Sequence, residues 1–228
     1  MGCAESSPAP RRSVAIAPDY SSATGYDSKK ILLKVILLGD SGVGKTSLMS
    51  KFVNHKFDGV YKATIGADFL TKEMRIGKKT VTMQIWDTAG QERYESLGGA
   101  FYRGADACVL LFDVNRQETF ARVGWWKEKF ITHSTSSRGG QTKASTAFLA
   151  VVGNKTDVEE EDGSPSRQVT AKAARQWAAD QTGAANADGM PYFETSAKTG
   201  AGVEDVFVMI ARRALGDIVK ATGDSGPL

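Results

Sequence analysis

Short, continuous runs of apolar residues recur along the chain. Residues 31–38, 107–113 and 148–153 form almost unbroken apolar runs of strand length, which is typical of strands covered on both faces. Segments with helical spacing lie between them, and helices are predicted at 44–54, 95–103, 118–133, 170–181 and 203–215. Thr170 is the predicted N-cap of its helix. Strands that alternate with helices predict an α/β fold with a mostly parallel sheet.

One pair of predicted strands breaks this alternation. Residues 68–76 and 80–86 are joined only by Gly77, Lys78 and Lys79. A connection this short cannot contain the crossover helix that parallel strands need. The two strands are therefore predicted to form an antiparallel hairpin.

The composition fits one folded domain with extra residues at the start. The chain has 228 residues, 41% of them hydrophobic, and a net charge of +3, so composition gives no support for a nucleic-acid partner. Cys3 and Cys108 are too few and too far apart for a disulfide framework or a zinc cluster, and Cys108 is expected to be a small core residue. Without a membrane-length apolar run or a signal-peptide core, the chain is expected to stay in the cytosol.

The segment from Gly39 to Thr46 reads Gly-Asp-Ser-Gly-Val-Gly-Lys-Thr and directly follows the predicted strand 31–38, which is typical of a phosphate-binding loop. Its glycines let successive backbone N–H groups face phosphate oxygens, and the helix that begins near Gly44 adds its positive dipole end. Lys45 is predicted to reach the β- and γ-phosphates and the Thr46 hydroxyl to bind Mg²⁺. The phosphates are further expected to lie against Ser41, Gly42, Val43, Gly44 and Ser47.

Two later motifs predict the base. Residues 154–157 (Asn-Lys-Thr-Asp) follow a predicted strand and so lie at the carboxyl edge of the sheet, where parallel sheets bind ligands. The Asp157 carboxylate can accept from N1–H and the 2-amino group of guanine, a donor pair that adenine lacks. In residues 194–198 (Glu-Thr-Ser-Ala-Lys), a backbone N–H of Ser196 or Ala197 could donate to guanine O6. The predicted guanine-binding residues are Asn154, Lys155, Asp157, Ser196, Ala197 and Lys198.

A fourth motif, residues 86–92 (Trp-Asp-Thr-Ala-Gly-Gln-Glu), carries candidate hydrolytic chemistry. Asp87 can hold Mg²⁺, directly or through water. Gly90 lets its N–H approach the γ-phosphate, and Gln91 is placed to orient the attacking water, since hydrolysis of GTP depends on in-line positioning more than on a strong base. Taken alone, Asp-Thr-Ala-Gly is also an ordinary turn.

Together these motifs resemble the small GTPases of the Ras superfamily, and within it the Rab family. The resemblance covers about residues 30–215, and the segments 61–73 and 192–198 are most similar to the late-endosomal and vacuolar Rab subgroup. It implies a three-layer P-loop GTPase fold, with a six-stranded, mostly parallel sheet, one antiparallel strand and helices on both faces. It also implies a slow, Mg²⁺-dependent GTP switch that regulates vesicle trafficking.

The resemblance implies roles for further residues. Thr64 would be the switch I threonine, contacting Mg²⁺ and the γ-phosphate only in the GTP state, within a switch I of about residues 55–66. Switch II would span 90–103, and catalysis would rest on Gln91, Lys45 and Thr64. Loss of the γ-phosphate would loosen both switch segments, so that the partners that bind them would dissociate.

An exchange factor, a GTPase-activating protein and GTP-dependent effectors are the implied partners. Phe69, Trp86 and Phe101 match a Rab aromatic triad that, with Ile65, couples the switches to effectors. Large aromatic residues in strands also commonly pack into the core, and that alternative stays open.

The two ends of the chain depart from the Rab pattern. Rabs usually end in prenylated cysteines, whereas this sequence ends Gly-Asp-Ser-Gly-Pro-Leu, which predicts no prenylation. Gly2, Cys3 and Ser6 instead fit a myristoylation signal with an adjacent palmitoylation site, and two acyl chains give stable attachment where one does not. A chance Met-Gly start or a lost C-terminal exon are the alternatives.

The predicted organisation is an acylated flexible tether at 1–29, a GTPase domain at 30–217 and a short disordered tail at 218–228, on the cytosolic face of a late-endosomal, lysosomal or vacuolar membrane. Three connections, 134–146, 159–167 and 183–189, are expanded relative to the family and are predicted surface loops. Two other functions stay open: a nucleotide-binding scaffold with little hydrolysis, against which Gln91 and Thr64 argue, and a P-loop metabolic kinase, which would need an arginine-rich lid.

Overall fold

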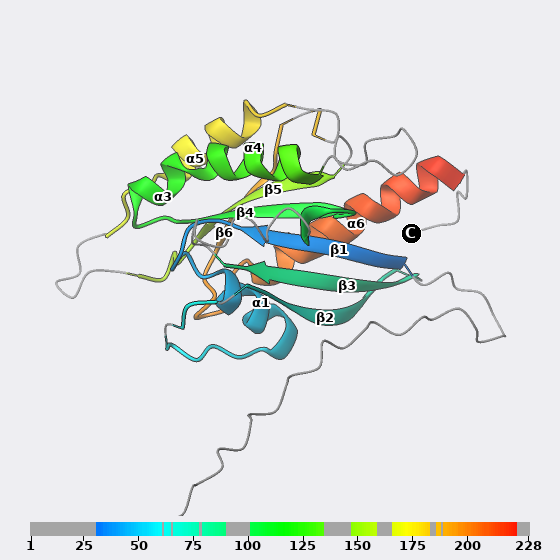
Figure 1. Cartoon of the computed structure of the whole chain (residues 1–228), viewed down its shortest axis with the longest axis horizontal. Helices are drawn as coiled ribbons and strands as arrows, with labels where there is room; N and C mark the ends of the chain where they lie inside the picture. Colours follow the sequence, from blue (N-terminus) through cyan, green and yellow to red (C-terminus); the bar gives the residue numbers. More distant parts are fainter. Residues whose placement is uncertain are drawn as a thin grey trace, which may run out of the picture.

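The computed structural model of the chain describes residues 31–60, 62–64, 66–77, 79–89, 101–134, 147–158, 166–182, 186–187 and 189–222. Its strands form one six-stranded sheet in the order β2-β3-β1-β4-β5-β6 (Figure 1). They are β1 (Ile31–Leu38), β2 (Ala67–Ile76), β3 (Lys79–Thr88), β4 (Ala107–Asp113), β5 (Phe148–Asn154) and β6 (Tyr192–Thr195). Neighbouring strands are parallel except β2 and β3, whose hairpin places Ile76 opposite Lys79. The predicted α/β architecture is confirmed.

Helices cover both faces of this sheet, as Figure 1 shows. They are α1 (Lys45–Asn54), α3 (Gln117–Ala121), α4 (Val123–Ser134), α5 (Ala171–Ala179) and α6 (Val203–Thr222). α1 and α6 pack on one face, where Phe52 stacks on Phe207 with ring centroids 3.9 Å apart. α4 and α5 pack on the other. Every residue of β4 is buried between the two layers, which accounts for its nearly unbroken apolar sequence.

Cys108 lies in this central strand and is fully buried, as predicted. Burial without a compensating partner raises the pKa of its thiol well above the ordinary value.

Three predicted helices differ from those in the structure. The helix expected at 118–133 is two helices that meet at Arg122; α3 is tied to the end of β4 through the Thr119 hydroxyl, which receives the Asp113 N–H, whereas α4 packs along the sheet. Apolar spacing does not record such an interruption, because Arg122 keeps a nearly helical backbone, with φ −88° and ψ −6°. α5 ends at Ala179 rather than 181, although Thr170 is its N-cap as predicted, accepting from the Ala173 N–H.

The third difference lies at the end of the chain. α6 continues to Thr222, so the tail predicted to begin at 218 starts inside a helix. No proline interrupts residues 216–222, and extending an existing helix is far easier than starting one.

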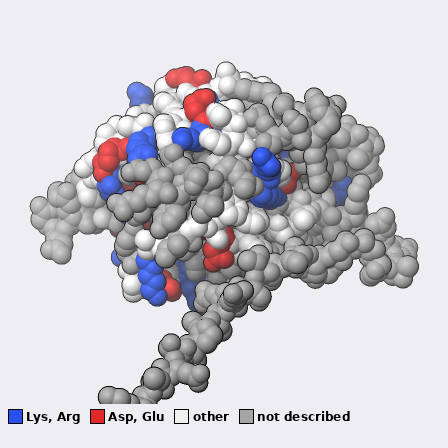
Figure 2. Space-filling model, in the orientation of Figure 1, with Lys and Arg blue, Asp and Glu red and all other residues white. Residues whose placement is uncertain are grey.

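Lys, Arg, Asp and Glu side chains are interspersed over the described part of the face in Figure 2, rather than gathered into one large area of a single sign. Much of the predicted surface loops lies outside the described residues, including residues 135–146 and 159–165.

Candidate nucleotide site

The predicted motifs meet around one cavity. β1, β3, β5 and β6 run parallel, so the segments that follow them emerge at the same edge of the sheet. The cavity has a volume of about 370 Å³, within the range of small-molecule sites. Of the predicted site residues, those lining it are Ser41, Gly42, Gly44, Lys45, Thr46, Ser47, Thr64, Asn154, Lys155, Asp157, Ala197 and Lys198. Val43, Asp87 and Ser196 are buried and are not among the lining residues.

Two glycines give the loop after β1 its shape. Gly39 has φ +147°, and a Cβ there would lie 2.2 Å from the Leu111 carbonyl oxygen; Gly44 has φ +97°, and a Cβ there would lie 2.4 Å from Asn154 Nδ2. Both positions combine a backbone conformation that other residues rarely adopt with a contact that leaves no room for a side chain. The loop therefore needs glycine at these points whether or not a ligand is bound.

Lys45 is a buried cation at the first turn of α1. Its Nζ donates to the carbonyl oxygens of Gly39 at 2.8 Å and Asp40 at 2.9 Å, and the residue is only 6% exposed. Burial lowers the pKa of Lys45 to about 8, opposed by attraction to Asp87 and Asp40. The loop thus holds an ammonium group at the floor of the cavity.

Three predicted Mg²⁺ ligands converge beside Lys45. Thr46 Oγ1 donates to Asp87 Oδ2 at 2.5 Å, and Thr64 Oγ1 lies 3.0 Å from Thr46 Oγ1 and 3.2 Å from Asp87 Oδ2. Burial raises the pKa of Asp87, although both hydroxyls and Lys45 favour its charged form. Its second oxygen, Oδ1, is buried without a hydrogen-bond partner in the described part of the chain.

An unpaired, buried carboxylate oxygen is costly, and this donor set of hydroxyls and one carboxylate is the hard-oxygen chemistry that Mg²⁺ prefers. The residues present therefore fit the ion that the sequence motifs imply.

The guanine end of the cavity is built on the loops after β5 and β6. Asp157 accepts through Oδ1 from the Ser196 hydroxyl, and Ser196 Oγ in turn accepts from the Thr199 N–H at 3.0 Å. The two N–H groups predicted to donate to guanine O6 have protein acceptors: Ser196 bonds to the Ala201 carbonyl, and Ala197 to Asn154 Oδ1 at 3.2 Å. Either donor can reach a base only by leaving or sharing that bond.

Asn154 connects two loops to the end of β5, and its amide atoms are all used in these contacts. It is fully buried; Nδ2 donates to the Val43 carbonyl at 2.9 Å, while Oδ1 accepts from the Thr195 hydroxyl and from the Ala197 N–H. The phosphate-binding loop and the loop after β6 are thereby attached to the same side chain at the end of β5.

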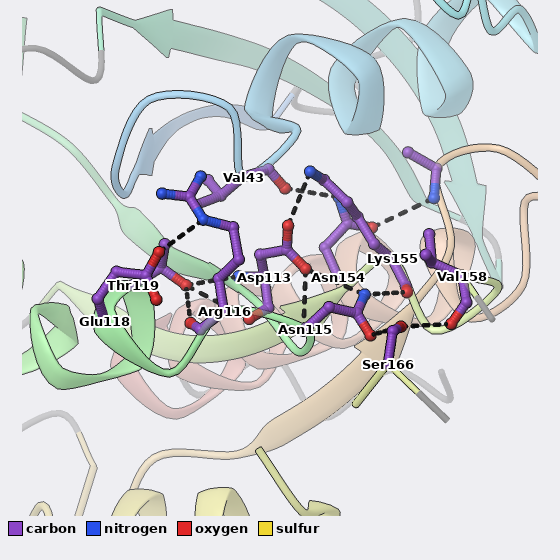
Figure 3. A network of polar contacts seen from close by, with 11 residues as sticks. Val43, Asp113, Asn115, Arg116, Glu118, Thr119, Asn154, Lys155, Val158 and Ser166 are labelled. Atoms are coloured by element: carbon purple, nitrogen blue, oxygen red, sulfur yellow. Dashed lines mark hydrogen bonds and ion pairs between the residues drawn. The ribbon is translucent and has the colours of Figure 1, made fainter. Parts of the chain in front are cut away.

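A second polar layer, shown in Figure 3, supports Lys155. The Lys155 ammonium pairs with Asp113 Oδ2 at 2.7 Å, and its carbonyl accepts from Asn115 Nδ2 at 3.0 Å. Asn115 Oδ1 accepts from Ser166, whose hydroxyl also contacts the Val158 carbonyl. Motif reasoning did not identify Asp113, Asn115 or Ser166, because their roles depend on contacts between separate loops.

The predicted aromatic triad joins β2, β3 and the segment before β4. Phe69 stacks on Trp86 with centroids 4.8 Å apart, and Trp86 contacts Phe101 at 5.8 Å. Phe69 is 45% exposed on the edge strand, whereas Trp86 and Phe101 are partly buried and pack against the core cluster beneath α4 and α5. The triad therefore extends from that core to the surface. Lys34 Nζ lies 4.8 Å from the Trp86 ring centre.

Several predicted residues fall outside the described part of the chain. They are Gly2, Cys3, Ile65, Gly90 and Gln91. The cavity also contains Phe57, an aromatic residue that is 40% exposed and was not predicted as a site residue. Its position in the expected switch I was a signal that could have identified it.

Comparison with known proteins identifies relatives over most of the chain. A model of the Ras family matches residues 34–216. Ras-related protein RABG3c of Arabidopsis thaliana is 54% identical over 187 residues, which cover 82% of this chain and 84% of that protein. Ras-related protein Rab7 of Prunus armeniaca is 52% identical and GTP-binding protein YPTC5 of Chlamydomonas reinhardtii 54% identical, with the same coverage.

Proposed function

This chain belongs to the Ras family, as a Rab GTPase of the late endosome and vacuole pathway that binds and hydrolyses GTP, and we propose that the cavity at the carboxyl edge of its sheet is the nucleotide site. The observation that carries this proposal is the meeting of Thr46, Thr64 and Asp87 beside the buried Lys45. These four side chains come from three separate segments of the chain. Lys45 supplies one cation, and the other three supply oxygen ligands for a second cation, Mg²⁺.

At the phosphate end, backbone N–H groups of residues 41–46 donate to phosphate oxygens, and Lys45 moves from the Gly39 and Asp40 carbonyls to the β- and γ-phosphates. Thr46, Thr64 and Asp87 would hold Mg²⁺, which would neutralise charge on those phosphates. Asp157 orients guanine at the other end, and Lys155, fixed by Asp113 and Asn115, closes the base pocket.

Hydrolysis is assigned to Gln91, which positions the water, with Gly90 donating to the γ-phosphate; both stay predictions. Without an arginine supplied to the site, the intrinsic rate is expected to be on the order of 10⁻⁴ to 10⁻² s⁻¹ and to rise with an activating protein. Loss of the γ-phosphate then frees Thr64, and effectors that contact Ile65 and the triad of Phe69, Trp86 and Phe101 dissociate.

Attachment to the cytosolic face of the late-endosomal or vacuolar membrane is assigned to the N-terminus. Gly2 and Cys3 lie within a signal for a myristoyl chain next to a palmitoyl chain. Two chains give the stable anchoring that one chain does not.

The proposed site is tested by release of a fluorescent GDP analogue with and without Mg²⁺. Chelation of Mg²⁺ should speed release by an order of magnitude or more, since it removes the charge that holds the phosphates. Thr46→Asn should release GDP fast even with Mg²⁺ present. Thr182→Asn, at an exposed position after α5, is the matched control and should behave as wild type. Equal retention with and without Mg²⁺ would contradict the assigned metal ligands.

A further inference from the structure

Asp40, in the phosphate-binding loop, is held from outside that loop by the helical layer over the sheet. Its Oδ1 accepts from the indole Nε1 of Trp126 at 2.7 Å and lies 3.4 Å from Nε of Arg122. Trp126 is 4% exposed, and the Asp40 side chain is 13% exposed. A hydrogen bond to a charged acceptor in such a shielded place is stronger than an ordinary surface contact.

The four-residue spacing of Arg122 and Trp126 places their side chains on one face of the helix. Arg122 is the residue at the break, and Trp126 follows one turn later, with its N–H bonded to the Arg122 carbonyl. Both side chains therefore point from the start of α4 to the same carboxylate oxygen.

The main chain of Asp40 contacts the catalytic lysine. Its carbonyl oxygen accepts from Lys45 Nζ at 2.9 Å, beside the equivalent bond from Gly39 at 2.8 Å. One residue thus connects two helices: its side chain is fixed by α4, and its carbonyl fixes the ammonium group at the beginning of α1.

We propose that Trp126 and Arg122 are positioning residues for nucleotide binding, because they hold the Asp40 carboxylate and thereby keep the loop and Lys45 in the shape that receives the β-phosphate. This inference rests on the nucleotide site proposed above. Neither residue contacts the nucleotide. Their effect passes through Asp40, and so it is confined to ligands that carry the phosphate that Lys45 contacts.

The test compares Trp126→Phe with Trp177→Phe. The first keeps an aromatic ring in the core but removes the N–H that Asp40 accepts. The second removes the same group from α5, where Trp177 packs edge-on against Phe120. Release of the fluorescent GDP analogue is measured for both, together with affinity for GDP and for GMP, which has no β-phosphate.

Trp126→Phe should speed GDP release about tenfold, the effect of losing a hydrogen bond to a charged group, and should weaken GDP while leaving GMP affinity unchanged. Trp177→Phe should match wild type in all three measurements. An unchanged GDP release rate, or an equal loss of GDP and GMP affinity, would overturn the proposal, since the second result indicates general damage to the fold.

Arg122→Gln provides a second variant if Trp126→Phe does not fold. The Arg122 side chain is 41% exposed, so the substitution is tolerable, and the expected acceleration is smaller, about two- to threefold. No acceleration in that variant would also overturn the proposal. Failure of the nucleotide site itself would look different, because wild-type protein would then not bind GDP.

Discussion

The side chain of Lys45 changes its charge close to neutral pH in the folded chain. Its pKa lies near 8 in the folded chain, against an ordinary value of 10.5. Between these values the unfolded chain holds a proton that the folded chain has lost, so stability increases with pH across this window. The favourable contribution is complete above pH 10.5 and is lost as the pH falls through 8, where the ammonium group is charged and buried.

Nucleotide binding should show the opposite dependence. Phosphates attract the charged form of Lys45, and above pH 8 the free protein holds mainly the neutral form. Affinity for GDP should therefore fall about tenfold between pH 7 and pH 9. Titration of binding by calorimetry measures this, with Lys45→Met as the comparison. That variant should bind more weakly but with little change over the same range; an equally steep fall in the variant would assign the effect to another group.

At the scale of the elements, Asn154 and Asn186 lie at opposite ends of β5 and make similar contacts. Asn154 attaches the phosphate-binding loop and the loop after β6 to the carboxyl end. Asn186 brackets Leu149 near the other end, with its Oδ1 accepting from the N–H and its Nδ2 donating to the carbonyl. Both amides are buried, but the ends they secure differ in function.

Substitutions at Asn154 and Asn186 separate an effect on folding stability from an effect on GDP binding. Asn154→Ala and Asn186→Ala should each lower the free energy of unfolding by about 2–4 kcal/mol, because each leaves buried partners unsatisfied. GDP affinity should fall strongly in Asn154→Ala and remain near wild type in Asn186→Ala. Urea unfolding without nucleotide and GDP titration measure the two quantities. Equal loss of affinity in both variants would show that Asn154 acts through global stability alone.

Local patterns predicted β1 at Ile31–Leu38 and β4 at Ala107–Asp113 with the observed bounds. Such strands are predictable because an apolar run and the turns that flank it depend only on residues close together in the sequence. The spacing of apolar residues could not predict the break at Arg122. The same spacing could not predict the contact between Trp126 and Asp40, a residue 86 positions earlier. Contacts between residues so far apart in the sequence depend on the packing of the whole fold.

The candidate site shows the same division. Motifs identified Lys45, Thr46, Asp87 and Asp157, because phosphate, metal and guanine each demand particular side chains at fixed spacings. The residues that hold those side chains in place carry no such signature. Asn115, for example, matches no motif, and its role follows only from its contact with Lys155 between the loops after β4 and β5.

For the whole molecule, the proposed membrane attachment concerns the N-terminus. No helix in the described part of the chain combines the length and apolar character needed to cross a bilayer. The proposal of membrane attachment rests on the acylation signal at Gly2 and Cys3, and it can be tested without altering the folded domain.

Gly2→Ala should move the protein from membranes to the soluble fraction, since without the first chain it does not sample membranes where Cys3 is acylated. Cys3→Ser should leave a smaller, exchanging membrane population, because a single myristoyl chain binds only marginally. Fractionation of cells that express the protein with a C-terminal fluorescent tag distinguishes these outcomes. Membrane association of Gly2→Ala equal to wild type would mean that another feature attaches the protein.

The burial of Cys108 has a practical consequence for labelling chemistry. The chain has two cysteines, and the thiol of Cys108 is both inaccessible and held in its unreactive, protonated form. Unacylated protein should therefore consume at most one equivalent of a thiol reagent when folded and two in urea. A dye can be attached through Cys3 to the natural sequence, and slow uptake of a second equivalent would time the opening of the central strand.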